Sequence, residues 1–179
     1  PVTMLVDPTE RERARDLRGS GIEQVEKPIG EFWLRDSGPT FVLRDDGRLG
    51  AVDWVFNGWG DQDWAEWKPD EDTARFVAEL AGAELVSSDL VNEGGGFQID
   101  CEGTVLLTDT VQLDPGRNPF AARARVEAEM ARTIGLQHAI WLPRGLTRDY
   151  EHLGTRGHVD IVAALPAPGK VQLHVQTDA

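Results

Sequence analysis

One pattern constrains the fold of this chain of 179 residues more than any other feature. A polar residue near a glycine, followed by a predicted β-hairpin, occurs three times along the sequence. The three polar residues are Asp36, Glu93 and His158, which lie about sixty residues apart with helix-like segments between them. Three diverged copies of a strand, hairpin and helix unit explain this spacing, although an ordinary α/β sheet can also produce it by chance. Units that each donate one inward polar residue are typical of a propeller-like α/β ring around a central site.

Turn signals between strand-like runs predict the hairpins of these units. Each signal combines glycine with aspartate, proline or another turn-forming residue, as tight hairpin turns require. We expect hairpins at residues 40–43 and 49–56, at 97–99 and 105–108, and at 159–164 and 171–175. The runs 2–6 and 139–142 add further strands.

Helical periodicity and capping residues predict three helices. Thr9 followed by Glu12 forms a capping box, and glycines after the segments are suited to end a helix. The helices are expected from Thr9 to near Gly19, from Asp70 to Gly82, and from Pro119 to Gly135. They fall between strand-like runs, which is typical of an α/β chain.

The chain is strongly acidic, with 31 aspartates and glutamates against 18 lysines and arginines and a net charge of −13. This charge disfavours nucleic acid and anionic lipid and could attract a small cation such as a guanidine or a polyamine, although it equally suits a well-solvated surface. No apolar run reaches the length of a membrane span. The single cysteine excludes an internal disulfide and indicates a cytoplasmic protein, while the start at Pro1 leaves a removed signal peptide as an alternative.

Asp36 lies at a predicted corner of the chain, where it could point into a cavity. It precedes Ser37, Gly38 and Pro39, and a proline restricts the residue before it and ends a preceding element. Two carboxylates can clamp a planar cation by paired hydrogen bonds. Asp36 is therefore a candidate for such a clamp, and a turn-capping aspartate is the alternative.

His158 and Asp160 lie two positions apart on a predicted strand. Residues i and i+2 of a strand point to the same side, so both would face one pocket. A histidine beside a carboxylate can carry protons. The alternatives are a half-buried strand that shows polar side chains to water, or a metal site. The other histidines have no ligand spacing, so we expect no metal.

Glu93 precedes three consecutive glycines, Gly94 to Gly96, which allow close backbone approach. The segment lacks the lysine and the spacing of a phosphate-binding loop. A tightly packed site around Glu93 is the favoured interpretation, and an exposed glutamate on a flexible loop is the alternative.

Trp33 and Cys101 also bear on the candidate site. Among the clustered tryptophans only Trp33 is tied to the site by sequence, three residues before Asp36, and aromatic faces bind cations. Packing is the alternative. Cys101 lies between Asp100 and Glu102, whose charges disfavour the thiolate that a nucleophile needs. We therefore interpret Cys101 as a turn residue, and the nucleophile of a complete thiol hydrolase is the alternative.

These residues resemble the agmatine deiminase family, which includes the bacterial type of peptidylarginine deiminase. The resemblance rests on ordered motifs at residues 33–41, 52–60, 93–95, 102–104, 117–119, 140–146 and 157–160. It implies a pentein-type α/β propeller of five ββαβ units around a pseudo-fivefold axis.

The resemblance also implies hydrolysis of a guanidine to a urea with release of ammonia, without a metal or organic cofactor. Asp36 and Asp160 would clamp the guanidinium, Glu93 would support it, and His158 would act as acid and base. A cysteine thiolate would attack the guanidinium carbon to form a covalent thiouronium. The expected reaction converts agmatine to N-carbamoylputrescine in bacterial polyamine synthesis.

The family's nucleophilic cysteine lies in a glycine-rich segment near the C-terminus, and Cys101 matches only a turn position. Residues 1–179 therefore resemble one incomplete catalytic domain, about three of five units, without the family's first strand or the cysteine segment. We expect the piece to be inactive alone and its open edges to favour a homo-oligomer.

Two alternatives remain open within this resemblance. The chain could be a non-catalytic guanidine-binding module that lacks the nucleophile, or it could act on peptidylarginine. Arg156 stands where the family commonly has an acid, so a cationic tail such as agmatine's could be recognised less well.

Overall fold

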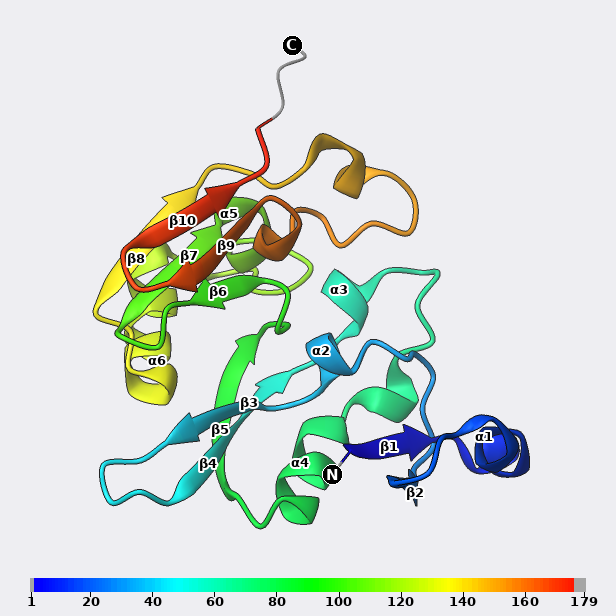
Figure 1. The fold of residues 1–179 in the computed structure, drawn as a ribbon. Coiled ribbons are helices and arrows are strands. Elements are labelled where there is room, and N and C mark those ends of the chain that lie inside the picture. The colour runs from blue at the N-terminus through cyan, green and yellow to red at the C-terminus, as the bar shows by residue number, and fades with distance from the viewer. Residues whose placement is uncertain (1, 176–179) are drawn as a thin grey trace.

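The computed structural model describes residues 2–175, which fold into helices and short β-sheets (Figure 1). Two three-stranded sheets form the centre. The first contains β3 (Thr40–Leu43), β4 (Leu49–Val55) and β5 (Glu84–Val91), and the second contains β6 (Phe97–Ile99), β7 (Thr104–Thr108) and β8 (His138–Leu142). The α/β class is therefore confirmed.

The two sheets have the same topology. In each, an antiparallel hairpin is followed by a helix and by a third strand that lies parallel to the second. The connecting helices are α4 (Thr73–Leu80) and α6 (Arg123–Ile134). Each sheet with its helix is thus a strand–strand–helix–strand unit, as the spacing of the polar residues predicts.

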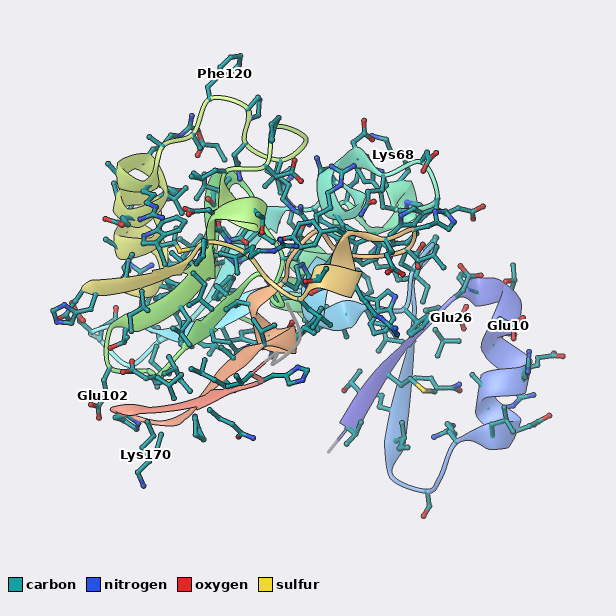
Figure 2. The ribbon with its side chains drawn as sticks, turned by 90° about the horizontal axis from the view of Figure 1, so that it is seen from above. Glu10, Glu26, Lys68, Glu102, Phe120 and Lys170 are labelled. Carbon is teal, nitrogen blue, oxygen red and sulfur yellow. The ribbon has the colours of Figure 1, made fainter. Side chains whose placement is uncertain are left out.

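Partial copies of this unit flank the two complete ones. Before them, β1 (Val2–Val6) pairs in parallel with β2 (Ile22–Glu26), and η1 (Pro8–Glu10) and α1 (Arg11–Leu17) lie between these strands. After them, β9 (Ala163–Ala167) and β10 (Lys170–Leu173) form an antiparallel hairpin. Figure 2 shows the first partial copy, marked by Glu10 and Glu26, on one side of the central sheets.

Short helical turns occupy the loops beside the hairpins. They are α2 (Leu34–Ser37), α3 (Gly58–Asp61), η2 (Lys68–Asp70), α5 (Asp109–Gln112), η3 (Thr147–Tyr150) and η4 (Val159–Ile161). Within residues 2–175, no helix combines the length and the apolar character that crossing a bilayer requires.

Alternating side chains of β7 divide the interior into two apolar clusters. Val105 and Leu107 belong to the main cluster, together with residues of β4, β5, β6 and α6. Leu106, between them, points to the other face of the strand and packs against Val159 and Ala163. Burying one such side chain stabilises the fold by about 1.5–3 kcal/mol. The smaller cluster therefore holds η4, and the polar residues on either side of Val159, against the sheet.

The strand predicted over residues 159–164 is wrong. Val159 begins the single turn η4, which the N–H of Val162 closes on the carbonyl of Val159 at 3.0 Å, and β9 begins only at Ala163. Val159 is fully buried while Ile161 is exposed, and a helical turn places these two side chains on different faces. The hairpin that follows is confirmed.

Two helix starts also differ from the prediction. Asp7, and not Thr9, caps the first helical segment, because its carboxylate accepts hydrogen bonds from the backbone and the hydroxyl of Thr9. The helix predicted from Pro119 begins at Arg123, because the Asn118 side chain bonds the backbone of neighbouring elements and holds this loop against β5.

Candidate active site

The predicted catalytic residues come from three loops that each precede a hairpin (Figure 1). Asp36 lies on α2 before β3, Glu93 precedes β6, and His158 and Asp160 lie at η4 before β9. Asp36, Glu93 and His158 are all buried. Because each unit presents the same loop, the chain brings residues that are far apart in sequence to one place.

Glu93 is fully buried, and Arg117 is its cationic partner. Nε of Arg117 donates to both carboxylate oxygens, at 2.9 and 3.1 Å, and Nη1 donates to Asp114 Oδ2 at 2.8 Å. Burial opposes the charge on Glu93, but Arg117 and His158 outweigh it and hold the pKa of Glu93 at about 2. Glu93 is therefore an anion at neutral pH.

His158 lies beside two carboxylates. Its Nε2 is 3.2 Å from Oε2 of Glu93, and its Nδ1 is 3.9 Å from Oδ1 of Asp160. Burial alone would lower the pKa of His158, but the hydrogen bond and charge of Glu93, with the charge of Asp36, raise it above its ordinary value. The imidazole is therefore suited to hold a proton near neutral pH and to transfer it.

Asp36 is a buried carboxylate to which no lysine or arginine of the described residues is paired. Its Oδ2 accepts a hydrogen bond from Nε1 of Trp59 at 3.0 Å, and its Oδ1 accepts one from the N–H of Gly95 at 2.9 Å. Burial raises the pKa of Asp36, although His158 counteracts part of this effect. A bound cation would stabilise the ionised carboxylate, so this position favours a positively charged ligand.

Asp160 forms a more accessible part of the site, with 31% of its side chain exposed. Its backbone N–H donates to the carbonyl of Gly95 at 3.3 Å, and its Oδ2 is 3.9 Å from Nε of Arg35. Burial raises the pKa of Asp160, and the charge of Asp36 adds to this, while His158 acts against it. Asp36 and Asp160 thus offer two incompletely paired carboxylates near one imidazole.

Gly94 and Gly95 pack too closely for a side chain. A Cβ on Gly94 would lie 2.1 Å from a backbone carbonyl oxygen, and a Cβ on Gly95 would lie 2.4 Å from Nδ1 of His158. The backbone of Gly95 also donates its N–H to the Asp36 carboxylate and accepts the backbone N–H of Asp160, so it links the Asp36 side chain to the main chain of Asp160. The predicted close backbone approach at this glycine run is confirmed.

Replacing Gly95 with alanine should displace His158 from Glu93. The added Cβ would overlap the imidazole, and overpacking of this kind costs about 1–3 kcal/mol of the free energy of unfolding. The pKa of His158 should fall toward its ordinary value, because the displaced imidazole lies farther from the Glu93 carboxylate. Urea unfolding measures the first effect and an NMR titration of His158 the second.

Gly19→Ala is the matched control for this substitution, because a Cβ on Gly19 would meet nothing within 4 Å. We expect it to change neither stability nor the titration of His158. Equal behaviour of the two alanine variants would contradict the packing role of Gly95.

Two residues that were not predicted as site residues contact the carboxylates directly. Arg117 binds Glu93, and Trp59 donates to Asp36. Trp59 has a φ of 60° inside a left-handed run at residues 58–61, which is unusual for a bulky side chain. The glycines on both sides of Trp59 are the signal that could have located it.

Trp33 and Cys101 do not take part in these contacts. Trp33 is 49% exposed as a residue, and its ring stacks on Phe32 with 4.6 Å between the ring centroids, so its role in substrate binding stays a prediction. Cys101 is exposed, with a φ of 63°, in the turn between β6 and β7. Figure 2 shows its neighbour Glu102 at the periphery of the molecule. The interpretation of Cys101 as a turn residue is confirmed.

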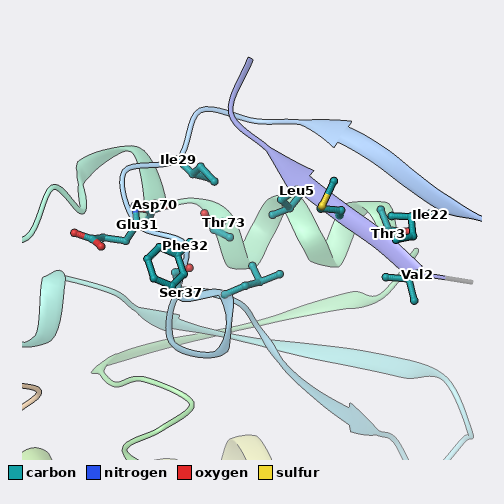
Figure 3. A pocket seen from close by; sticks show the side chains of 12 residues that line it. Val2, Thr3, Leu5, Ile22, Ile29, Glu31, Phe32, Ser37, Asp70 and Thr73 are labelled. Atoms are coloured by element: carbon teal, nitrogen blue, oxygen red, sulfur yellow. The ribbon is translucent and has the colours of Figure 1, made fainter. Parts of the chain in front are cut away.

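A separate cavity of about 310 Å³ lies between β1 and α4 (Figure 3). Its lining is largely apolar and includes Leu5, Ile22 and Phe32, with Asp70 and Thr73 among its few polar groups. None of the four candidate catalytic residues lines it. The cavity is therefore distinct from the candidate active site.

Comparisons with known sequences cover the whole chain. The profile of the Porphyromonas-type peptidyl-arginine deiminase family matches residues 1–179. A Streptomyces coelicolor protein named "Putative agmatine deiminase" is 56% identical over 178 residues, which are 99% of this chain and 52% of that protein. The agmatine deiminase of Stutzerimonas stutzeri is 37% identical over 184 residues, covering 100% of this chain and 49% of that protein. The chain spans about half the length of the curated relatives it matches.

Solved structures agree with the sequence comparisons. The agmatine deiminase of Enterococcus faecalis superposes with a TM-score of 0.91 at 32% identity, over 99% of this chain and 49% of that one. A Porphyromonas gingivalis protein named "Putative Arginine Deiminase" gives a TM-score of 0.80 at 28% identity, over 93% and 50% of the two chains. The likeness in fold therefore extends over nearly the whole chain.

Proposed function

We propose that this chain, which belongs to the Porphyromonas-type peptidyl-arginine deiminase family, supplies the guanidinium clamp and the proton carrier of a hydrolase that converts a guanidine to a urea and ammonia. One observation carries the proposal. The buried Asp36 and the partly exposed Asp160 lie near His158. Within residues 2–175 no lysine or arginine pairs with Asp36, and the Arg35 Nε that pairs with Asp160 is 3.9 Å from it. A planar guanidinium could bind both carboxylates by donating paired hydrogen bonds to their oxygens.

The proposed reaction begins with the guanidinium held by Asp36 and Asp160. A cysteine thiolate supplied from another part of the domain attacks the guanidinium carbon and forms a C–S bond. His158 gives a proton to one departing nitrogen, which leaves as ammonia, and a thiouronium remains on the cysteine. His158 then takes a proton from water as the water oxygen attacks the same carbon. The C–S bond then breaks while the new hydroxyl group passes its proton to ammonia or solvent, which leaves a neutral urea product, the thiolate and a protonated His158.

Glu93 and Arg117 serve His158 in this scheme. The anionic Glu93, 3.2 Å from Nε2, stabilises the imidazolium and fixes the ring, while Arg117 keeps Glu93 ionised in its buried position. A carboxylate held by a buried guanidinium group is oriented before substrate arrives, so little reorganisation is needed during the reaction.

Agmatine, converted to N-carbamoylputrescine, is the proposed substrate, and peptidylarginine is the second candidate. Arg156 puts a positive charge where the family commonly has an acid, which disfavours a cationic tail. In this chain, however, Nη1 of Arg156 lies 3.3 Å from Oδ2 of the buried Asp114, which also pairs with Arg117 and so offsets only part of that charge. Agmatine is the first candidate because relatives named agmatine deiminase are 56% and 37% identical to this chain.

The units are proposed to be sectors of a pentein-type propeller, with the site at its centre. Two complete strand–strand–helix–strand units and two partial ones support this arrangement, and each of the three site loops precedes a hairpin. The span of about half of each relative supports a nucleophile located elsewhere in the domain.

Incubation of the full-length protein with agmatine tests the function. Mass spectrometry should detect N-carbamoylputrescine, with one ammonia released for each product molecule. Asp36→Asn should reduce kcat/KM by about 10- to 100-fold, because a hydrogen bond between charged groups is worth about 1.5–3 kcal/mol. Cys101→Ser is the control, and we expect it to be as active as the wild type because Cys101 lies in an exposed turn.

Three other outcomes would redirect the assignment. Agmatine that binds without turnover indicates a non-catalytic guanidine-binding module. Turnover of peptidylarginine alone indicates the second substrate. Loss of activity in Cys101→Ser would contradict the proposed location of the nucleophile.

A further inference from the structure

The loop that leads into His158 has an unfavourable backbone conformation. Leu153, Arg156 and Gly157 have φ values of 71°, 67° and 113°, and two of these residues are not glycine. Left-handed non-glycine residues cost free energy and persist only where the surroundings over-determine them. Some group must therefore hold this segment in place.

The holding group is the buried carboxylate of Asp149, at the end of η3. Oδ1 accepts a hydrogen bond from the N–H of Thr155 at 2.8 Å, and Oδ2 accepts bonds from the Thr155 hydroxyl at 2.6 Å, the Gly157 N–H at 2.6 Å and the His158 N–H at 3.1 Å. The main-chain carbonyl of Asp149 also accepts the N–H of Arg156 at 3.0 Å. Four consecutive residues thus donate their backbone N–H groups to one aspartate, and bonds to a charged carboxylate are stronger than neutral ones.

The same loop also contacts Arg117, the residue that binds Glu93. The carbonyl of Thr155 accepts a hydrogen bond from Nη2 of Arg117 at 2.8 Å, and Nε of the same Arg117 binds Glu93. The backbone of His158 and the carboxylate of Glu93 are therefore both positioned relative to residues 155–158. A shift of this loop would change the distance of 3.2 Å between Nε2 of His158 and Oε2 of Glu93.

We propose that Asp149 is a positioning residue for the deiminase reaction, because it fixes the loop that sets the imidazole of His158 against Glu93. This inference rests on the proposed function for its effect on turnover, but its structural part stands without it. The hydrogen bonds of the Asp149 carboxylate go to residues 155–158, so its positioning role is exerted through His158 and through the Thr155 carbonyl that Arg117 binds. The charge of Asp149 also raises the pKa of Asp160.

Asp149→Asn in the full-length protein tests the proposal. The amide keeps the size of the side chain, but its NH₂ group would replace an oxygen that accepts from N–H donors. We expect kcat for agmatine to fall about 100-fold, as displacements of about 1 Å can cause, with KM within a few-fold of the wild type. The pKa of His158 should also fall toward 6.5, because the imidazole moves away from Glu93.

The titration of His158 is the readout that distinguishes positioning from general support of the fold. Glu93, Asp36, Asp160 and Arg117 are the charged groups that act on this histidine, and the substitution alters none of them. It does remove the charge of Asp149, which acts on Asp160, so the titration is also followed in Thr155→Val, which keeps that charge. NMR follows His158, whose signal is identified from the His158→Gln variant. It needs no substrate, so it remains decisive even if agmatine is not turned over.

Asp100→Asn is the matched control, because Asp100 also accepts two backbone N–H bonds, from Glu102 and Thr104, but in the exposed β6–β7 turn. It should change neither kcat nor the pKa of His158. If Asp149→Asn does not fold, Thr155→Val should show the same effects in a weaker form. It removes the hydroxyl bond to Asp149 at 2.6 Å and the contact of that hydroxyl with the His158 N–H at 3.3 Å.

A folded Asp149→Asn with the wild-type kcat and His158 pKa would overturn the proposal. So would a loss of kcat with an unchanged His158 pKa, since Asp149 would then be merely structural. Wild-type values in Thr155→Val would count against it in the same way.

Discussion

Arg117→Met should destabilise the full-length protein by about 3–5 kcal/mol, the cost of leaving a buried charge without its partner. Arg117 and Glu93 both have fully buried side chains, and Arg117 also binds Asp114 and the carbonyl of Thr155. Methionine has a similar length but no positive charge. Urea unfolding at neutral pH measures the loss.

The pH dependence of stability should change as well. The pKa of Glu93 is lowered to about 2, so its ionisation stabilises the fold above the ordinary value of 4.5, and this contribution is lost as the pH falls toward 2. Arg117 is the largest of the influences that lower this pKa. The free energy of unfolding of Arg117→Met should therefore fall less between pH 4.5 and pH 2 than that of the wild type.

Arg48→Met is the control for an ion pair at the surface. Nε of Arg48 lies 2.7 Å from Oδ2 of Asp46, and 63% and 49% of the two side chains are exposed. Solvent screening makes such pairs weak, so stability should change little. Addition of Glu93→Gln to Arg117→Met should recover part of the loss, because it removes the unpaired charge. A double variant less stable than Arg117→Met would contradict this explanation.

Local turn chemistry explains why much of the fold could be predicted from the sequence. Gly47, Gly103 and Gly169 adopt left-handed conformations in the three hairpin turns, a conformation that most other residues disfavour. A turn that contains such a glycine can be recognised from the few residues around it. The strands β2 and β5 were not predicted, because polar and charged residues interrupt their apolar runs. Pairing with β1 and β4, which lie far away in sequence, decides their conformation.

The candidate site could be predicted from residue types, but the groups that support it could not. Asp36, Glu93 and His158 stand beside glycines or proline, which mark them locally. Arg117 lies 24 residues after Glu93 in the sequence, and Trp59 lies 23 residues after Asp36. No helical or strand periodicity relates the members of either pair. His158 and Asp160 are neighbours as predicted, but on a helical turn and not on a strand, because burial of the residue between them selects the turn.

His158→Gln should reduce the kcat of the full-length protein for agmatine by about 10²- to 10⁴-fold, the range for a lost general acid–base group. Glutamine can still accept or donate a hydrogen bond at Glu93, but it cannot exchange a proton near neutral pH. Because Asp36 and Asp160 remain, the KM for agmatine should change far less than kcat. Steady-state ammonia release measures both parameters, and a kcat within a few-fold of the wild type would exclude His158 as the proton carrier.

The same variant should alter stability above pH 6.5. The pKa of His158 is raised in the folded state, so the imidazolium stabilises the fold fully below 6.5, and this contribution is lost as the pH rises through the raised value. His158→Gln lacks the titrating group, so its thermal midpoint should fall less than that of the wild type over this window. His138→Gln, at the exposed start of β8, is the control, because it removes an imidazole that is not buried. Parallel curves for wild type and His158→Gln would mean that the buried imidazole gains no proton affinity from Glu93.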